Sequence, residues 1–309
     1  MPLNLRSTNR SICTVALDRT FDTISEARIP FDFSSNFAQI VGSCNGLLCI
    51  ADYGNVRDIY LWNPSIRKFK KLPHPCLSKP SFALLGFAYH SQNNDYKVVR
   101  ISSSLLSLHE IEVYTLSLDS WGRVGFNLKP DLKFFDKDHF LPTPLVSGDL
   151  HWIAVMREGE ENHKNKNMIM LIVRKLALPH VSVDANNLNR CLASFKGKLA
   201  FITSEHSEQL GFRHSIWVMR EYGVVESWTK LFVVPFPQQI DCIAFTEYGS
   251  LLTFCFIHSS PLDMQKYELL LIDAKTLQQR KDPDIQYLSS IAAFMESLVL
   301  LDGANMVSY

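Results

Sequence analysis

The feature that most constrains this chain is an internal repeat with a period of about 50 residues. In each copy a polar turn leads into a short apolar segment that has the composition of a buried strand. The copies are Asn45-Gly46-Leu47-Leu48, Asn94-Asp95-Tyr96-Lys97, Ser147-Gly148-Asp149-Leu150, Lys196-Gly197-Lys198-Leu199, Tyr248-Gly249-Ser250-Leu251 and Met295-Glu296-Ser297-Leu298. Because one small sheet cannot bury both of its faces, each copy needs neighbouring copies to form a core.

A second pattern recurs inside the repeat: an aromatic strand is followed by a turn and then by an outer strand that begins with an aromatic residue. It links Tyr60-Leu61-Trp62 with Lys68-Phe69, Val113-Tyr114 with Ser120-Trp121, and Ile216-Trp217 with Ser227-Trp228. Each unit therefore reads as four antiparallel strands, A to D, joined by hairpins. In the first unit we expect strand A near residues 40–41, B at 47–51, C at 58–62 and D at 69–72.

These patterns predict an all-β fold, a single kelch-like β-propeller of six four-stranded blades closed by N- and C-terminal strands. Five units are complete, and residues 289–301 read as an A–B hairpin only. We expect strands at 11–17 and 28–33 to complete the ring, with Ile12 to Leu17 pairing in the same sheet as Ser297 to Leu301. Residues 1–37 then form an N-terminal segment that contributes closing strands, and residues 38–309 form the propeller domain.

The balanced charge of the chain argues against partners that are attracted by a strong overall field. There are 31 Lys and Arg against 31 Asp and Glu, and the pI is near 7.1. We therefore expect neither nucleic acid nor a membrane surface among the partners. Apolar runs such as 168–173 are far shorter than the roughly 18 to 20 residues that span a bilayer, and the first residues lack the apolar core of a secretory signal. A cytoplasmic or nuclear location is expected.

No pattern predicts catalytic, cofactor-binding or metal-binding residues. The seven cysteines are scattered without a CxxC pair, which argues against a disulfide framework or a zinc site. The run Gly42-Ser43-Cys44-Asn45-Gly46 superficially matches a nucleophile elbow, but a strand follows it and not a helix. We expect a hairpin there, with positive φ angles at Asn45 and Gly46. His139, His151 and His163 lack metal-ligand spacing, and His151 is expected to pack within a strand.

The five tryptophans all fall in predicted strands: Trp62, Trp121, Trp152, Trp217 and Trp228. Large aromatic side chains at such positions are typical of packing between sheets. We therefore expect them to contribute stability and not binding.

Loop lengths indicate which face of the fold binds a partner. The A–B turns are short, whereas the B–C connections are mostly long and polar, at 52–57, 102–109, 157–167, 204–213 and 258–266. Successive hairpins alternate between the two faces, so all B–C loops share one face, and variable loops on a rigid scaffold are common binding sites. With aromatic and arginine anchors favoured, the predicted contacts with a target protein are Tyr53, Arg57, Arg157, Glu160, His206, Arg213 and Met264.

An ordered series of motifs between about residues 38 and 301 resembles the F-box-associated domain of plant F-box/kelch-repeat proteins. The series comprises Val41-Gly42-Ser43-Cys44-Asn45-Gly46-Leu47-Leu48-Cys49, Leu61-Trp62-Asn63-Pro64-Ser65-Ile66-Arg67-Lys68-Phe69, Gly86-Phe87-Ala88-Tyr89, Asn94-Asp95-Tyr96-Lys97-Val98-Val99, Gly148-Asp149-Leu150-His151-Trp152, Ile216-Trp217-Val218-Met219 and Glu226-Ser227-Trp228.

The resemblance implies that this chain is the substrate-recognition module of a Skp-cullin-F-box ubiquitin ligase and captures a target protein for ubiquitination. Nothing before Val41 resembles the F-box pattern, so a Skp-type adaptor is expected as a partner only if an F-box lies upstream. Two alternatives stay open. A propeller-only regulator would compete with full-length F-box relatives for one target. A propeller hydrolase would need acids or histidines at inner-strand ends, where stretches such as 84–87 and 243–245 are mostly apolar.

Overall fold

The computed structural model describes residues 3–6, 10–16, 24–33, 38–52, 58–76, 82–103, 109–125, 132–134, 142–158, 164–170, 175–179, 190–207, 211–236, 240–246, 249–257, 266–273, 276–282, 292, 294, 296–299 and 306–308. The chain divides into two compact units. The first comprises Met1–Leu132 with Ser289–Tyr309, and the second comprises Lys133–Leu288. In the described ranges the structure is made of strands, with a single 3₁₀ helix, η1, at Val225–Ser227.

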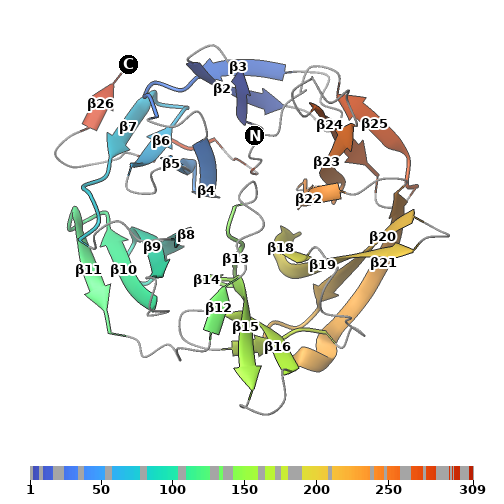
Figure 1. Cartoon of the computed structure of the whole chain (residues 1–309). Coiled ribbons are helices and arrows are strands. Elements are labelled where there is room, and N and C mark those ends of the chain that lie inside the picture. Colours follow the sequence, from blue (N-terminus) through green and yellow to red (C-terminus); the bar gives the residue numbers. More distant parts are fainter. Residues whose placement is uncertain are drawn as a thin grey trace. The chain divides into compact units, whose positions relative to one another are not determined.

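The first unit contains three antiparallel sheets (Figure 1). The N-terminal strands form a three-stranded sheet in the order β1-β2-β3: β1 (Leu3–Arg6), β2 (Arg10–Ala16) and β3 (Ile24–Arg28). The next sheet has the order β26-β7-β6-β5-β4 and is built from β4 (Ala38–Cys44), β5 (Leu47–Asp52), β6 (Ile59–Asn63), β7 (Lys68–Lys71) and β26 (Met306–Ser308). The third is a meander of β8 (Phe82–His90), β9 (Asp95–Ser103), β10 (His109–Thr115) and β11 (Ser120–Val124).

The second unit contains three four-stranded sheets and one small hairpin. The first of these sheets has the order β12-β15-β16-β17, from β12 (Leu132–Phe134), β15 (Trp152–Glu158), β16 (Lys164–Met170) and β17 (Lys175–Ala177). The small hairpin pairs β13 (Leu145–Val146) with β14 (Asp149–Leu150). Two meanders follow: β18 (Arg190–Phe195), β19 (Lys198–Ser207), β20 (Gly211–Met219) and β21 (Trp228–Phe236), then β22 (Ile240–Phe245), β23 (Leu251–Ile257), β24 (Lys266–Ile272) and β25 (Gln279–Asp282).

The all-β prediction and the repeat of antiparallel meanders are confirmed, but the prediction of six four-stranded blades is not. The described residues form four four-stranded sheets and not six. The predicted first unit has all four of its strands, but β26 makes it a five-stranded sheet. Of the predicted closing strands near the N-terminus, residues 11–16 belong to a three-stranded sheet of their own, whereas residues 29–33 are not in a strand.

The tight turns have the geometry that the sequence predicts. Asn45 and Gly46 adopt φ angles of 49° and 78°, and the same pair of positive angles recurs at Ser147-Gly148 and Lys196-Gly197. Two successive positive φ angles match the right-handed twist of the strands that they join. A strand follows Cys44, as expected, and not the helix of a nucleophile elbow.

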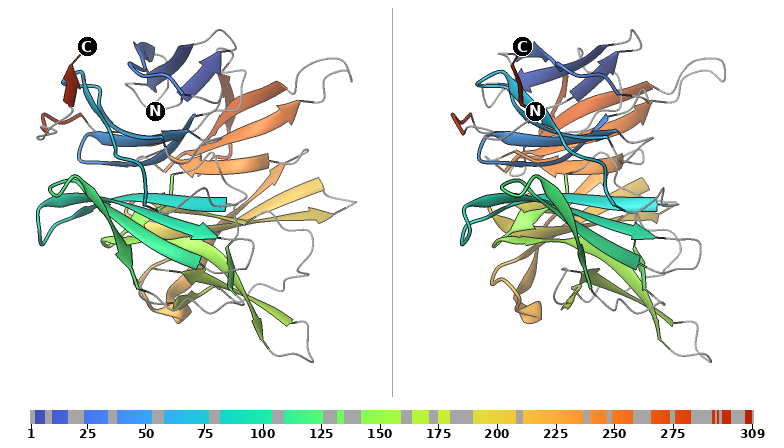
Figure 2. Two further views of the ribbon diagram at one scale, coloured as in Figure 1. Left: turned by 60° about the vertical axis from the view of Figure 1, so that its left-hand side comes forward. Right: turned by 90° about the vertical axis from the view of Figure 1, so that its left-hand side faces the viewer.

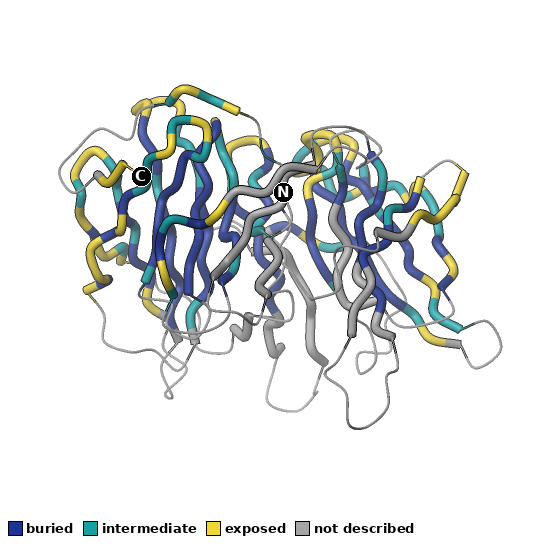
Figure 3. The backbone as a smooth tube through the Cα atoms, turned by 90° about the horizontal axis from the view of Figure 1, so that it is seen from above, coloured by how far each residue is buried: buried dark blue, intermediate teal, exposed yellow. Residues whose placement is uncertain are grey.

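The β4–β7 sheet is buried on both faces. One face packs against β8–β11, and the inner strands β4 and β8 approach so closely that a Cβ on Gly42 would lie 3.0 Å from the Cβ of Phe87. The opposite face is covered by the segment after β3, where Phe31 stacks on Tyr60 with ring centroids 4.1 Å apart. Figure 3 shows the resulting pattern of buried strands and exposed turns.

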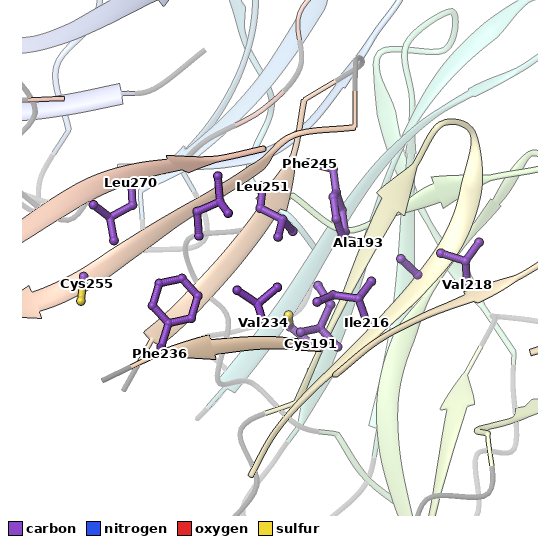
Figure 4. Packing of buried hydrophobic residues seen from close by; sticks show 13 residues of the cluster. Cys191, Ala193, Ile216, Val218, Val234, Phe236, Phe245, Leu251, Cys255 and Leu270 are labelled. Atoms are coloured by element: carbon purple, nitrogen blue, oxygen red, sulfur yellow. The ribbon is translucent and has the colours of Figure 1, made fainter. Parts of the chain in front are cut away.

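In the second unit the same kind of core joins neighbouring meanders. Figure 4 shows Cys191, Ile216, Val234 and Phe236 on the β18–β21 sheet directed toward Leu251, Cys255 and Leu270 on the β22–β25 sheet. The Phe195 and Phe245 rings, on the inner strands β18 and β22, meet edge to face with their centroids 4.8 Å apart. Apolar packing between consecutive sheets is therefore the organising interaction of both units.

The predicted pairing of Ile12 to Leu17 with Ser297 to Leu301 is wrong. Strand β2 pairs with β1 on one side and with β3 on the other, so both of its backbone edges are occupied. Residues 297–299 are not in a strand. They lie instead against the β4–β5 turn, where a Cβ on Gly46 would be only 2.3 Å from the Cβ of Ser297.

The buried side chain of Asn63 holds this C-terminal segment in place. Its Nδ2 donates hydrogen bonds to the carbonyls of Ser297 and Val299, each at 3.0 Å. Its Oδ1 accepts a bond from the backbone N–H of Ser65, also at 3.0 Å. Both the NH₂ group and the carbonyl oxygen of this buried amide are thus hydrogen-bonded, as burial of a polar group requires.

Two tryptophans fasten an outer strand to the preceding sheet. Trp121 on β11 donates its indole N–H to the carbonyl of Pro73 at 2.7 Å, and Trp228 on β21 donates to the carbonyl of Ala177 at 3.1 Å. These bonds join residues 48 and 51 positions apart. Each separation is close to the repeat period of about 50 residues, so each bond connects one repeat with the next. The indole N–H of Trp152, by contrast, is buried without a hydrogen-bond partner.

Replacing Trp121 or Trp228 with Phe is expected to destabilise the fold by about 0.5–1.5 kcal/mol beyond the cost of the smaller ring, because a partly buried hydrogen bond from the indole N–H is lost. Trp152→Phe is the matched control, since all three tryptophans are similarly buried but Trp152 makes no such bond. Chemical denaturation of the three variants checks this. Equal losses in all three would show that the indole bonds contribute nothing.

Asn63→Asp is expected to destabilise the protein by about 2 kcal/mol or more, because two backbone carbonyls would then face a carboxylate oxygen and not an N–H donor. Asn93→Asp, in the exposed turn between β8 and β9, makes the same chemical change where water can solvate it. Urea unfolding midpoints of both variants test the prediction. A similar midpoint for the two would contradict the tethering role of Asn63.

Candidate protein-binding surface

The structure describes three of the seven predicted contact residues. Tyr53, Arg57, Glu160 and Met264 lie outside the described residues. Arg157 is on β15, opposite Asn165 on β16, close to the tip of that hairpin. His206 and Arg213 lie on β19 and β20, and both are exposed. The described part of the predicted surface is therefore concentrated on the B–C hairpins of the second unit.

Each of these hairpins extends past one of the strands that flank it. Pairing between β18 and β19 begins at Arg190 and Thr203, whereas β19 and β20 continue to Ser207 and Gly211. The β15–β16 pairing likewise runs well beyond β17. Figure 2 shows the strand pairs of this unit reaching toward the same side. Strand β21 stays paired with β20 as far as Phe212, and Phe212 is partly buried against the core, so the unpaired edge at the tip of this hairpin is that of β19.

The tip of the β19–β20 hairpin combines charge with an aromatic contact. Glu205 lies directly opposite Arg213, and His206 lies opposite Phe212 with ring centroids 4.6 Å apart. Because adjacent strand residues point to opposite faces, His206 and Arg213 belong to different faces of the hairpin. The sequence prediction placed both on the right hairpin but missed Glu205 and Phe212. Their alternation with His206 and Arg213 is the signal that could have found them.

A buried Ser–His pair anchors the base of this hairpin. The Oγ of Ser204 lies 2.6 Å from Nδ1 of His214, and the His214 ring packs edge-on against Phe236. Burial lowers the pKa of His214 to about 4, so the ring is neutral at physiological pH. Nε2 of His214 is buried without a hydrogen-bond partner, and no acid orients the ring from that side in the described structure. The pair therefore stabilises the hairpin and lacks the arrangement of a nucleophile with its base.

The corresponding hairpin of the first unit carries an ion pair. The backbone N–H of Asp52 donates to the carbonyl of Asp58 at 3.0 Å and closes the β5–β6 connection. Lys71 Nζ lies 2.7 Å from Oδ1 of Asp58 and 5.5 Å from the centre of the Tyr60 ring. The hydrogen bond that Lys71 donates to Asp58 raises the pKa of Lys71. This effect is larger than the lowering of that pKa by partial burial. This end of the sheet therefore presents a fixed cation and anion side by side.

His151 is a structural histidine, as the sequence predicts. It is buried, and its Nδ1 donates to the carbonyl of Pro144 at 3.2 Å. Its Nε2 lies 3.0 Å from the hydroxyl oxygen of Tyr222, and that hydroxyl donates to Asp149 at 2.8 Å. The chain of bonds joins the β13–β14 region to the turn between β20 and β21.

The described residues offer little to hydrolytic or metal chemistry. No group of three or more His, Cys, Asp or Glu side chains among them is placed to hold a metal ion. Burial raises the pKa of the Cys44 thiol, which is the opposite of what activates a nucleophile. The Arg100–Glu112 pair, at 2.6 Å, is completely buried and out of reach of a substrate. Within the described ranges, no helix has the length and hydrophobicity that crossing a membrane requires.

In the first unit, the ends of the sheets away from that unit's own B–C connections carry exposed apolar residues that the sequence analysis did not single out. Leu118, in the β10–β11 turn, is 72% exposed, and Leu298 in the C-terminal segment is 80% exposed. Single exposed leucines are common on protein surfaces. They nevertheless provide a comparison for any test of which face binds.

Together, the repeated antiparallel meanders define an all-β repeat protein. The chain belongs to the family described as F-box associated beta propeller domain, which matches residues 4–291. This confirms the family resemblance that the motifs indicate.

Relatives in Arabidopsis thaliana carry F-box names. F-box protein At4g22390 is 25% identical over 76% of this chain and 62% of its own length. F-box protein CPR1 is 26% identical over 75% and 60%, and F-box/kelch-repeat protein At3g23880 is 26% identical over 65% and 54%. The chain thus spans little more than half the length of the curated relatives it matches.

Among solved structures, the crystal structure of TolB from Acinetobacter baumannii matches with a TM-score of 0.51 and 11% identity. The match covers 94% of this chain and 64% of TolB. At this identity the likeness concerns the fold alone.

The depressed pKa of His214 predicts a loss of stability in mild acid. Its folded pKa of about 4 lies below the ordinary value of 6.5, so the unfolded chain binds the proton more readily between these values. The contribution is complete above pH of about 6.5 and is lost as the pH falls toward 4, by about 3 kcal/mol in total. His214→Leu should flatten this part of the stability profile, measured by denaturation from pH 4 to 7.5. His206→Leu, on the same hairpin but exposed, should leave the profile in place; equal profiles for the two variants would refute the assignment.

Proposed function

We propose that this chain is a substrate-recognition module of a Skp-cullin-F-box ubiquitin ligase and binds its target protein through the B–C hairpins. The observation that carries the proposal is the family match over residues 4–291, together with F-box proteins as relatives. A fold alone does not specify a function. The projecting hairpins add a physical site, because polar and aromatic side chains on a rigid scaffold suit protein recognition.

In this proposal the chain binds and does not catalyse. The tip of the β19–β20 hairpin supplies an exposed guanidinium, a carboxylate and an imidazole that contacts a phenyl ring at a tilt. Arg213 and Phe212 are the kinds of side chain that dominate interface energies. The remaining predicted contacts, Tyr53, Arg57, Arg157, Glu160 and Met264, extend the surface to neighbouring hairpins.

The ubiquitin-ligase role brings further partners into the proposal. A Skp-type adaptor binds only where an F-box accompanies this domain. The division into an N-terminal segment, residues 1–37, and a propeller domain, residues 38–309, is part of the same proposal. A cytoplasmic or nuclear location goes with this role. The alternative of a regulator that competes with F-box relatives uses the same target-binding surface, so one experiment on that surface serves both.

The test compares two sets of substitutions in the full chain, expressed in plant cells with the proteasome inhibited and read by proximity labelling. The first set is His206→Ala, Phe212→Ala and Arg213→Ala on the B–C side. The control is Leu118→Ser, in the β10–β11 turn of the first unit, away from that unit's own B–C connections. We expect the first set to reduce labelling of specific proteins by about tenfold or more, as loss of interface anchors does, and the control to change it little.

Denaturation profiles of the purified variants establish that the fold is intact. Equal loss from both sets, or loss from Leu118→Ser alone, would overturn the assignment of the binding face. If no protein depends on either set, the recognition function itself is wrong.

A further inference from the structure

The outer edge of β7 already accepts an extended segment. Strand β26 pairs with it antiparallel, with Met306 opposite Lys70, Val307 opposite Phe69 and Ser308 opposite Lys68. Figure 1 shows β26 beside β7, outside the rest of its sheet. Among the described sheets this is the one with a fifth strand. The backbone of β7 is therefore a working edge for strand addition, the mode in which many domains bind extended peptides.

The segment that occupies this edge is held by few interactions. It has three residues, whereas β20 and β21 have nine each. Val307 is 46% exposed, and Ser308 is exposed as well. The chain is fixed firmly upstream, where Asn63 binds the carbonyls of Ser297 and Val299. The C-terminal strand is thus a short, tethered occupant that a better-matched segment would displace.

The charges along the β7 edge indicate which kind of segment would pair with it more favourably than the C-terminal strand. Four of the five residues from Arg67 to Lys71 are basic. Lys70 is neutralised by Asp119 at 2.9 Å and Lys71 by Asp58 at 2.7 Å. No carboxylate of the described residues forms an ion pair with Arg67, which is exposed, or with Lys68.

The described tail residues Met306–Ser308 place no charged side chain opposite these two cations. They place Val307 opposite Phe69 but a neutral serine opposite Lys68. Opposite charges on directly paired strand residues stabilise a sheet, and like charges destabilise it. The edge therefore favours an occupant with an apolar residue opposite Phe69 and an acidic one opposite Lys68.

We propose that the outer edge of β7 is a strand-addition site for an extended acidic segment of a partner protein, which displaces Met306–Ser308. This inference rests on the proposed function only in taking the occupant to be a protein. It concerns a different part of the molecule from the B–C hairpins, and it is tested with purified protein and synthetic peptides, without ligase or target.

The first experiment uses the chain's own tail as the probe. A fluorescent peptide of residues 302–309 carrying Ser308→Glu is titrated into the full-length protein and into a full-length variant with Met306→Pro and Val307→Pro. The prolines remove ladder donors and empty the edge. We expect the variant to bind the peptide at least about fivefold more tightly, because the tethered strand no longer competes. Equal binding to both proteins would overturn the proposal.

The second experiment tests the charge match and does not depend on emptying the edge. Against the unmodified chain, the Ser308→Glu peptide should bind about two- to fivefold more tightly than a Ser308→Lys peptide. Lys68→Glu in the protein should reverse that order. Lys230→Glu, on the outer edge strand β21 of another sheet, should leave it unchanged. An order that does not respond to Lys68→Glu, or that responds equally to Lys230→Glu, contradicts the assignment.

Discussion

Both faces of the four-stranded sheets are apolar, and this makes every sheet depend on its neighbours. Leu47 and Leu48 are adjacent on β5 and point to opposite faces, yet both are fully buried. Burial of such side chains contributes about 1.5–3 kcal/mol each, and no single sheet can obtain it alone. Contacts between consecutive sheets, with the indole bonds of Trp121 and Trp228, therefore decide the stability of each unit and hold the hairpins that project from it.

Polar groups inside these layers are fixed in place and give the exposed hairpins a firm base. The Arg100–Glu112 pair and the neutral His214 ring are enclosed by apolar residues. Removing one partner of such a pair leaves a buried polar group that water cannot reach, which costs far more than the bond itself contributes. Recognition can then be carried by side chains only one or two residues further along the same strands, such as Phe212 and Arg213.

The sequence predicts local structure well because the signals for it are local. Asn45-Gly46 specifies its turn through two backbone conformations, and the four strands of the first repeat follow from the alternation of apolar segments around it. The predicted pairing of the N- and C-terminal strands failed for a physical reason. Backbone hydrogen bonding lets any strand edge pair with any other. Strand β2 pairs with β1 and β3, and no local sequence pattern predicts this choice of partners.

For the proposed binding surface, too, some features could be predicted from local sequence and others could not. Loop length identified the β19–β20 hairpin, but the grouping of side chains on its faces depends on register. A shift of one residue would exchange the two faces, so His206 with Phe212, and Glu205 with Arg213, become visible as pairs only once the pairing of strands is known.

The bonds from Asn63 to Ser297 and Val299 also bear on how the protein is made. They connect residues 234 and 236 positions apart, so the β4–β7 sheet, which leaves the ribosome directly after β1–β3, cannot complete its hydrogen bonds until residues 297–299 have been synthesised. Contacts of such long sequence separation form late, and exposed strand edges invite aggregation while they wait. A sheet that is translated early is thus finished only near the end of synthesis, and a ribosome that stalls before residue 297 releases a chain whose β4–β7 sheet still lacks these bonds.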